Sequence, residues 1–349
     1  MRDRSGKVLG WALWSPHSEI SLRLLDRRPD AIIDKEWWHD RIAAALHRRK
    51  SLHSVASAFR LVHGEADGCP SLICDRYDRW LVVQLLSAGV ESFRDAILSA
   101  LDALLQPEGI LARNDVPVRA KERLPRLTEC LLGSVPREIE VHEHGVRYLA
   151  APWDGQKTGA FLDQRENRAL VGQVATGRTL DCFSYHGSFA LHLARKASSV
   201  IALDASAAAL ARAMQNMQRN SLTNIEFRVA DVFDFLRTEE SSGSQYDTIV
   251  LDPPAFAKTK SALPGALRGY KEINLRAMRL LRPGGLLFSA SCSFHMNKAR
   301  FLEMLEEAAS DSGRRLALRD IRGQPVDHPE ILTMPETSYL KGALIEALD

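Results

Sequence analysis

Short apolar runs alternate with amphipathic stretches from residue 165 onward. Runs of this kind, bounded by turn residues, are typical of strands that are buried on both faces of a sheet. They predict strands over residues 178–183, 199–203, 225–229, 247–251 and 286–291, with helices over 187–196, 206–220, 232–237 and 271–281. Regular alternation of strand and helix predicts an α/β fold whose doubly wound parallel sheet carries helices on both faces.

The first part of the chain has a different pattern. Residues 7–25 alternate apolar and polar side chains around Ser15-Pro16 and predict two short strands, too few for an independent domain. Further on, the pattern predicts a helix over residues 35–50, strands over 57–62, 71–75 and 80–86, a helix over 91–105 and a hairpin over 138–150. Glycines and prolines cluster over residues 133–152. This cluster predicts a boundary between a smaller α+β region and the larger sheet.

Charge is balanced over the whole chain but not within it. The 349 residues include 46 Lys+Arg and 44 Asp+Glu, a net charge of +2, which excludes a chain-wide basic field. Residues 23–60 hold nine Lys+Arg against five Asp+Glu, and residues 113–126 hold five against two. These two segments are candidate nucleic-acid contacts, although such runs are as often ordinary solvated surface.

Cysteine use and the N-terminal sequence indicate the cytoplasm. The five cysteines include no CxxC pair, so we expect neither a disulfide framework nor a metal site. The N-terminus has no apolar segment ahead of a small-residue cleavage site, and no long apolar run could span a membrane.

Three acidic residues, Asp181, Asp204 and Asp231, lie at the ends of three successive predicted strands. Doubly wound sheets bind ligands at this edge, near the switch in strand order. Asp204 could accept both ribose hydroxyls of an adenosine, and Asp231 could accept its adenine amino group. Each acid alone is more often a helix cap. The glycine turn over residues 181–187 resembles the first motif of S-adenosylmethionine (SAM) methyltransferases, whereas the full GxGxxG fingerprint of nicotinamide sites is absent.

The fourth strand ends in Asp252-Pro253-Pro254-Ala255-Phe256. Two prolines cannot continue a sheet, so they predict a rigid loop that could offer an acid and backbone carbonyls to a planar base. Asp-Pro-Pro at this position is typical of nucleobase methyltransferases. In the N6-adenine enzymes an aromatic residue follows the prolines directly, and the intervening Ala255 argues against that activity.

The fifth strand ends in Ser291-Cys292-Ser293. A lone cysteine is most often a small buried hydrophobe. At a strand end beside a cofactor cleft it has a second interpretation, because carbon 5 of a pyrimidine is not nucleophilic and needs covalent activation before it can be methylated. A thiolate that adds to C6 provides that activation, and Asp252 could support the charge that develops toward N3.

These motifs together resemble the bacterial 23S rRNA cytosine-C5 methyltransferases. The resemblance covers nearly the whole chain, and its most specific segments are residues 153–168, 251–254, 268–271 and 291–293, with further matches at 141–145, 327–329 and 339–342. The family has a PUA domain, a small central α/β domain and a C-terminal class I SAM domain. It implies a PUA-like remnant over residues 1–34, a central domain over 35–136 and the methyltransferase domain over 137–349.

The resemblance also implies roles for individual residues. Cys292 is the expected nucleophile, and Asp252 and Lys258 are expected to face the base. SAM is the implied cofactor, and its expected contacts are Asp163, Gln164, Arg165, Asp181, Phe183, Ser184, Gly187, Asp204, Asp231 and Asp252. For the base that removes the C5 proton, Lys258, Tyr270 and His295 stay open as alternatives. The implied partner is 23S rRNA or a large-subunit assembly intermediate, and a homodimer is a candidate assembly.

One departure from the family affects RNA binding. In the family a basic segment and several strands precede the stretch that matches residues 6–9, where this chain starts. We therefore expect either a shortened PUA-like module or a start assigned too late. Alternative functions are guanine-N7 methylation, since a related bacterial family shares the Phe-Leu-Asp-x-Arg and Asp-Pro-Pro features, and a non-catalytic rRNA-binding assembly factor. A nicotinamide oxidoreductase is a more distant alternative.

Overall fold

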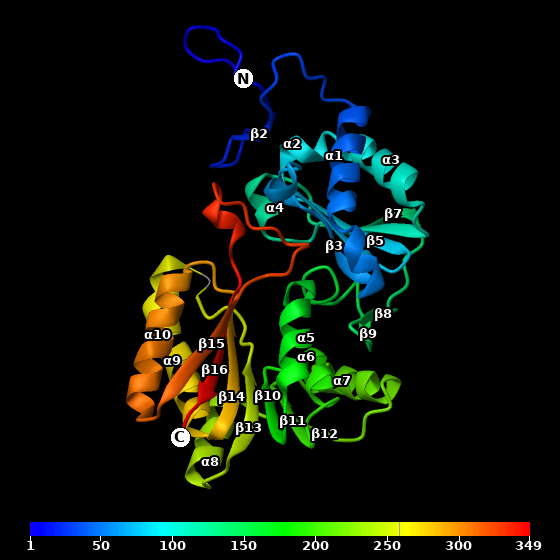
Figure 1. The fold of residues 1–349 in the computed structure, drawn as a ribbon. Helices are drawn as coiled ribbons and strands as arrows, with labels where there is room; N and C mark the ends of the chain where they lie inside the picture. Colours follow the sequence, from blue (N-terminus) through cyan, green and yellow to red (C-terminus); the bar gives the residue numbers. More distant parts are fainter. Residues whose placement is uncertain (258) are drawn as a thin grey trace. The chain divides into compact units, whose positions relative to one another are not determined.

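The chain forms two compact units. The computed structural model describes residues 1–257 and 259–349. Unit 1 comprises residues 1–145, 149–162 and 326–337, and unit 2 comprises residues 146–148, 163–325 and 338–349. Each unit contains its own main sheet, and Figure 1 shows the course of the chain through both. The three-part division expected from the sequence remains a prediction.

The sheet of unit 2 has seven strands in the order β12-β11-β10-β13-β14-β16-β15. Its strands are β10 (Arg178–Cys182), β11 (Ser199–Asp204), β12 (Ile225–Val229), β13 (Tyr246–Leu251), β14 (Leu281–Ser291), β15 (Leu316–Arg322) and β16 (Lys341–Ala347). The five strands from β12 to β14 pair in parallel, and the strand order reverses at β10. β16 pairs antiparallel with both β14 and β15. The predicted doubly wound α/β sheet is therefore confirmed, and an antiparallel edge is added to it.

Helices cover both faces of this sheet (Figure 1). They are α5 (Arg165–Val174), α6 (Ser188–Leu193) and α7 (Ala207–Arg219) on one face, and α8 (Val232–Ser241), α9 (Leu263–Arg279) and α10 (Lys298–Ser312) on the other. α9 begins well before the predicted residue 271, because Pro264 lies in its first turn, where the missing N–H costs nothing. Among the described residues, no helix is long and apolar enough to cross a membrane.

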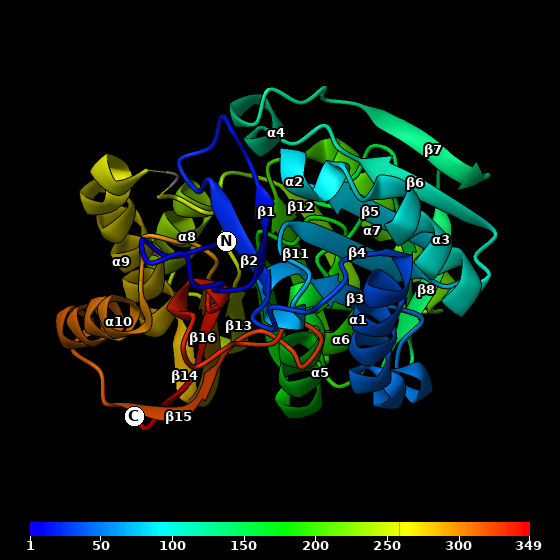
Figure 2. The ribbon, with the colours of Figure 1, turned by 90° about the horizontal axis from the view of Figure 1, so that it is seen from above.

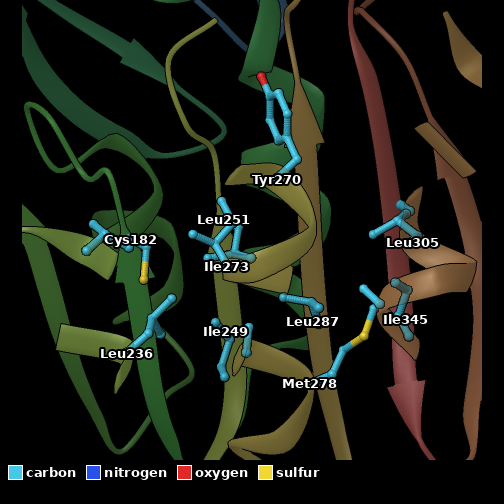
Figure 3. Packing of buried hydrophobic residues seen from close by; sticks show 14 of the residues in the cluster. Cys182, Leu236, Ile249, Leu251, Tyr270, Ile273, Met278, Leu287, Leu305 and Ile345 are labelled. Carbon is cyan, nitrogen blue, oxygen red and sulfur yellow. The ribbon is translucent and has the colours of Figure 1, made fainter. Parts of the chain in front are cut away.

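The face under α8, α9 and α10 encloses an extensive apolar core. Figure 3 shows Leu251 and Leu287 on the strands packing against Ile273 and Met278 of α9. Each such side chain contributes about 1.5 to 3 kcal/mol when it is fully buried. The Tyr270 ring lies at the end of this cluster and its hydroxyl points away from it. The core thus holds a polar group at the carboxyl end of the sheet.

Unit 1 contains a five-stranded sheet in the order β3-β4-β5-β6-β7. The strands are β3 (Ala58–His63), β4 (Leu72–Tyr77), β5 (Trp80–Leu85), β6 (Gly109–Arg113) and β7 (Thr128–Gly133). Trp38 and Ile42 of helix α1 (Lys35–Arg48) and Leu101 of α3 (Arg94–Leu105) share one buried core with these strands. Figure 2 shows α1 and α3 beside the sheet. The shorter elements are β1 (Trp11–Trp14), β2 (Leu22–Asp26), α2 (Ala88–Glu91), α4 (Val118–Lys121), β8 (Ile139–Glu143) and β9 (Val146–Ala150).

Buried ion pairs attach later segments of the chain to the sheet of unit 1. The Arg60 guanidinium donates to both oxygens of Asp75, at 2.8 and 2.9 Å. Thr158 also donates to Asp75, at 2.5 Å, and the Arg60 amide donates to the Asp327 carboxylate at 2.8 Å. Arg49 and Asp67 form a second buried pair, with nitrogen–oxygen distances of 2.6 Å. The contacts of Thr158 and Asp327 join segments 149–162 and 326–337 to β4 and β3.

Candidate active site

The turn between β10 and α6 has an unusual backbone. Phe183 and Tyr185 both have positive φ angles, of 64° and 51°, and Gly187 follows with φ 79°. Positive φ is uncommon for side-chain-bearing residues, and such positions gather at ligand sites where surrounding contacts hold them. Gly187 also has little room, since an added Cβ would lie 3.0 Å from Ala213. The turn is therefore fixed both by its conformation and by close packing.

Asp181 is buried at the end of β10 with an incomplete set of partners. Its Oδ2 accepts hydrogen bonds from the Ser184 hydroxyl at 2.6 Å and the Ala190 amide at 3.0 Å. Its Oδ1 has no hydrogen-bond partner among the residues that the structure describes. Burial raises the pKa of Asp181 to about 7, and the two hydrogen bonds only partly oppose this effect. A buried acceptor in this state is suited to a ligand that brings its own cation.

Asp204 is the last residue of β11 and is half-buried. Its Oδ2 accepts from the Tyr185 amide at 2.9 Å, so it supports the turn after β10. Its Oδ1 accepts from the Ser206 amide at 2.8 Å. Asp204 thus connects the carboxyl ends of β10 and β11, where a bound adenosine would need a ribose acceptor.

Asp231 is the N-cap of α8. Its Oδ1 accepts from the amides of Phe233 and Asp234, at 2.9 and 3.1 Å. The alternative interpretation of this acid as a helix cap is therefore confirmed. The residue is exposed, so capping leaves its carboxylate accessible to a ligand.

Asp252 follows β13 directly and is held by the segment before α5. Its Oδ1 accepts from the Gln164 side chain at 2.8 Å, and Gln164 in turn accepts from the Asn167 amide group at 2.6 Å. Gln164 and Asn167 are both buried. This chain fixes the orientation of the Asp252 carboxylate at the edge of the sheet.

The neighbours of Gln164 are buried as well. Asp163 accepts a hydrogen bond from the Tyr339 hydroxyl at 2.7 Å. Arg165 has no exposed surface and pairs with Glu166 at 2.9 Å. The structure thus gathers Asp163, Gln164 and Arg165 at the start of α5, where Gln164 contacts Asp252.

The residues after Asp252 join an aromatic cluster. The Phe256 ring lies 4.6 Å from that of Tyr270, 6.0 Å from Phe233 and 6.3 Å from Phe183. Phe256 is half-buried and packs against the apolar core of unit 2. The expected position facing the base, Lys258, lies outside the described residues.

Tyr270 links the loop after β13 to the turn that contains Cys292. Its hydroxyl lies 3.0 Å from the Ser293 hydroxyl and donates to the Pro254 carbonyl at 3.4 Å. The Ala257 amide also donates to Ser293, at 3.3 Å. Burial raises the pKa of Tyr270, so its hydroxyl keeps its proton at neutral pH. Because β13 and β14 are neighbouring parallel strands, these bonds hold Asp252 and Cys292 at the same edge of the sheet.

Cys292 follows the last residue of β14. Ser291 and Ser293 on either side are completely buried, whereas Cys292 is half-buried. The Ser293 amide donates to the Ser291 hydroxyl at 3.2 Å, which closes the turn locally. The two serines therefore fix the backbone, and the cysteine between them keeps access to solvent.

One buried cation beside this turn was not predicted from the sequence. Lys341 begins β16 and pairs in register with Ser291. Its ammonium donates to the carbonyls of Ser293 and Tyr339, at 2.8 and 2.7 Å. A lysine at the head of a mostly apolar strand was the available signal, but periodicity alone does not say what it contacts.

The two basic segments carry less available charge than their composition indicates. In residues 113–126, Arg113 and Arg119 are buried and pair with Asp115 and Glu91. In residues 23–60, six arginines pair with acids inside the unit: Arg23, Arg28, Arg41, Arg48, Arg49 and Arg60. The exposed basic residues of the later segment are Lys121, Arg123 and Arg126.

The family comparison agrees with this arrangement. Residues 60–335 match the family of S-adenosylmethionine-dependent methyltransferases. The chain is 41% identical over 347 residues to a protein of Erwinia tasmaniensis named ribosomal RNA large subunit methyltransferase I, with 97% of this chain and 88% of the relative covered. It is 42% identical to the protein of the same name from Tolumonas auensis, with 99% and 89% covered.

Solved structures show the same fold. SMU.776, solved in complex with S-adenosylhomocysteine, has a TM-score of 0.86 at 22% identity, and the alignment covers 99% of this chain and 90% of that one. A candidate SAM-dependent methyltransferase from Streptococcus mutans has a TM-score of 0.84 at 22% identity, with the same coverage.

Proposed function

Since this chain belongs to the family of SAM-dependent methyltransferases, we propose that it methylates C5 of a cytosine in large-subunit rRNA. The rRNA substrate is supported by relatives about 40% identical that are named ribosomal RNA large subunit methyltransferases. The choice of cytosine C5 depends on one observation. A half-buried cysteine lies between two fully buried serines at the end of β14, next to the strand that Asp252 follows.

The described residues fit SAM. The unpaired Oδ1 of Asp181 can accept from the ammonium of its methionine part, Asp204 from the ribose hydroxyls and Asp231 from the adenine. Ser184 and the Phe183–Gly187 turn shape this pocket, and Asp163, Gln164 and Arg165 support its edge. When bound, SAM supplies an electrophilic methyl group and leaves as S-adenosylhomocysteine.

Cys292 supplies the nucleophile in this proposal. Its thiolate forms a bond from Sγ to C6 of the cytosine, and the electron pair of the C5–C6 double bond makes C5 nucleophilic. After C5 has gained the methyl group, a base removes the C5 proton. The C–H electron pair restores the double bond and expels the thiolate. Asp252, oriented by Gln164, acts here in its protonated form: its carboxyl O–H donates to N3 and so supports the negative charge that develops there.

The structure favours some candidates over others for the base that removes the C5 proton. Tyr270 keeps its proton at neutral pH and is engaged with Ser293 and Pro254, which favours a structural link. His295 is half-buried two residues after Ser293 and stays a candidate. Lys258 is the other candidate. We expect the reaction to take place in the cytoplasm, on 23S rRNA or an assembly intermediate.

Methyl transfer by Cys292→Ala tests this function. We expect the wild type and the matched variant Cys130→Ala, an exposed cysteine of unit 1, to form 5-methylcytosine in rRNA taken from a strain lacking this gene. Cys292→Ala should bind SAM normally by calorimetry but form no product. RNA containing 5-fluorocytosine should trap a covalent complex with the wild type and with Cys130→Ala, but not with Cys292→Ala.

Other products would identify the alternative functions. Methylation that persists in Cys292→Ala, with 7-methylguanine as the mapped product, would overturn the cytosine-C5 proposal. Absence of SAM binding by the wild type would indicate a non-catalytic rRNA-binding factor.

A further inference from the structure

Lys341 is a buried cation without a carboxylate partner among the described residues. It is 5% exposed, and its ammonium donates to the backbone carbonyls of Ser293 and Tyr339. Burying an ammonium costs several kcal/mol unless nearby groups compensate its charge. Two carbonyl dipoles offset only part of this cost, so the position calls for a further explanation.

The group that could compensate the charge of Lys341 is the side chain of Cys292, the residue before Ser293. Lys341 lies opposite Ser291 in the β14–β16 pair and reaches Ser293, so its ammonium spans the turn that contains Cys292. Burial lowers the pKa of Lys341 to about 8, and the charge of Cys292 opposes this change. Tyr270 on α9 also senses the charge of Cys292, and it is neutral at pH 7.

We propose that Lys341 is a positioning residue for Cys292, whose ammonium holds the turn through the Ser293 carbonyl and stabilises the thiolate form of the cysteine. This inference rests on the proposed role of Cys292 as the nucleophile. Only the thiolate adds to C6, so a cation beside the thiol increases the reactive fraction at neutral pH. The thiol proton passes to solvent in this step, and Lys341 remains an ammonium.

The ionisation of Cys292 is measured by alkylation without RNA or SAM. Iodoacetamide is added over a range of pH, and each cysteine is followed by peptide mass spectrometry. The exposed Cys130 serves as an internal reference, since Cys69, Cys74 and Cys182 are buried. We expect the Cys292 thiol to titrate below the ordinary value of about 8.5.

Two variants separate charge from hydrogen bonding. Lys341→Gln can still donate to both carbonyls but carries no charge, and Lys341→Met removes both properties. We expect each to raise the Cys292 pKa by about one unit or more, so alkylation at pH 7 falls about tenfold while that of Cys130 is unchanged. A purely structural lysine would predict rescue by Gln, and an unchanged pKa in the Gln variant would overturn the inference.

If neither Lys341 variant folds, the pKa of Cys292 in the wild type alone still tests the proposed role of Lys341. A wild-type Cys292 pKa of about 8.5 or higher would overturn the role of Lys341. That result, together with methylation that depends on Cys292, would leave the cytosine-C5 function intact. A lowered pKa with methylation that survives Cys292→Ala would instead keep the thiolate and overturn the proposed function.

Discussion

Units 1 and 2 each bury a carboxylate completely, but they compensate its charge differently. Asp75 in unit 1 and Asp181 in unit 2 are each 1% exposed. Burial opposes the ionisation of Asp75, but the charge and hydrogen bonds of Arg60 outweigh it and hold the pKa below its ordinary value. Burial raises the pKa of Asp181 to about 7, and no cationic side chain pairs with it among the described residues.

We propose that this difference separates a structural charge, Asp75, from one kept for a ligand, Asp181. Asp75 has its cation within the fold, where the pair joins segment 149–162 to the sheet through Thr158. Asp181 destabilises the unliganded unit 2, and a ligand that carries an ammonium would remove that cost on binding. Perturbed acids that lack an internal partner are therefore candidates for function, whereas paired ones are more often structural.

The largest expected effect follows from removing Arg60, the cation that pairs with Asp75 inside unit 1. Arg60→Met leaves the buried Asp75 without its guanidinium and should reduce the free energy of unfolding by about 3 to 5 kcal/mol. All six tryptophans lie in unit 1, so urea unfolding followed by tryptophan fluorescence reports this unit alone. The SAM affinity of the folded variant should stay within about twofold of the wild type.

A double variant provides the control for this prediction. Arg60→Met with Asp75→Leu replaces both charges by apolar groups and should recover much of the lost stability. A single variant as stable as the wild type would show that Asp75 does not depend on Arg60, and the contrast with Asp181 would fail.

Asp181→Asn should have the opposite effect on stability. Asparagine can accept the same two hydrogen bonds without a buried charge, so the unliganded unit 2 should gain about 2 to 4 kcal/mol at pH 8. SAM binding should weaken by about 30-fold or more, because the ammonium loses a buried anionic partner. Hydrogen exchange of the β10–β13 peptides measures the first effect and calorimetry the second.

The stability of unit 2 and its affinity for SAM should both depend on pH through Asp181. The pKa of Asp181 in the folded chain, about 7, lies above its ordinary value of 3.8. The cost of ionising it is therefore absent below pH 3.8 and complete above about pH 7, so the gain from Asp181→Asn should vanish in acid. Wild-type SAM affinity should fall about tenfold for each pH unit below about 7, and the variant should lack this dependence. A pH-independent affinity in the wild type would contradict the assignment.

The strands of unit 2 could be predicted from the sequence where both of their faces are buried. Strands such as Tyr246–Leu251 are covered on both faces and appear as continuous apolar runs. α5 was missed because its first turn buries Arg165, a residue that an amphipathic pattern assigns to the surface. β16 was missed because it begins with a lysine and a glycine, which argue against a buried strand until tertiary contacts are known.

The site was predictable as far as chain order determines it. Strand ends meet at one edge of a parallel sheet, so Asp181, Asp204 and Asp252 could be placed together. The contact of Gln164 with Asp252 joins residues 88 positions apart, and that of Lys341 with Ser293 joins residues 48 apart. No local pattern encodes such contacts, and the same is true of the internal ion pairs that reduce the basic segments.

The smallest expected effect concerns Asp231, for which we propose a ligand-binding role beside its structural role as a helix cap. As the cap of α8 it satisfies two backbone amides, so Asp231→Ala should destabilise unit 2 by about 1 kcal/mol. Asp231→Asn keeps a capping oxygen and should leave hydrogen exchange in α8 near that of the wild type. If the second carboxylate oxygen accepts from the adenine, both variants should bind SAM several-fold more weakly, because the amide oxygen is occupied by the cap. Calorimetry that finds only the alanine variant impaired would instead assign Asp231 to capping alone, as a structural acid like Asp75.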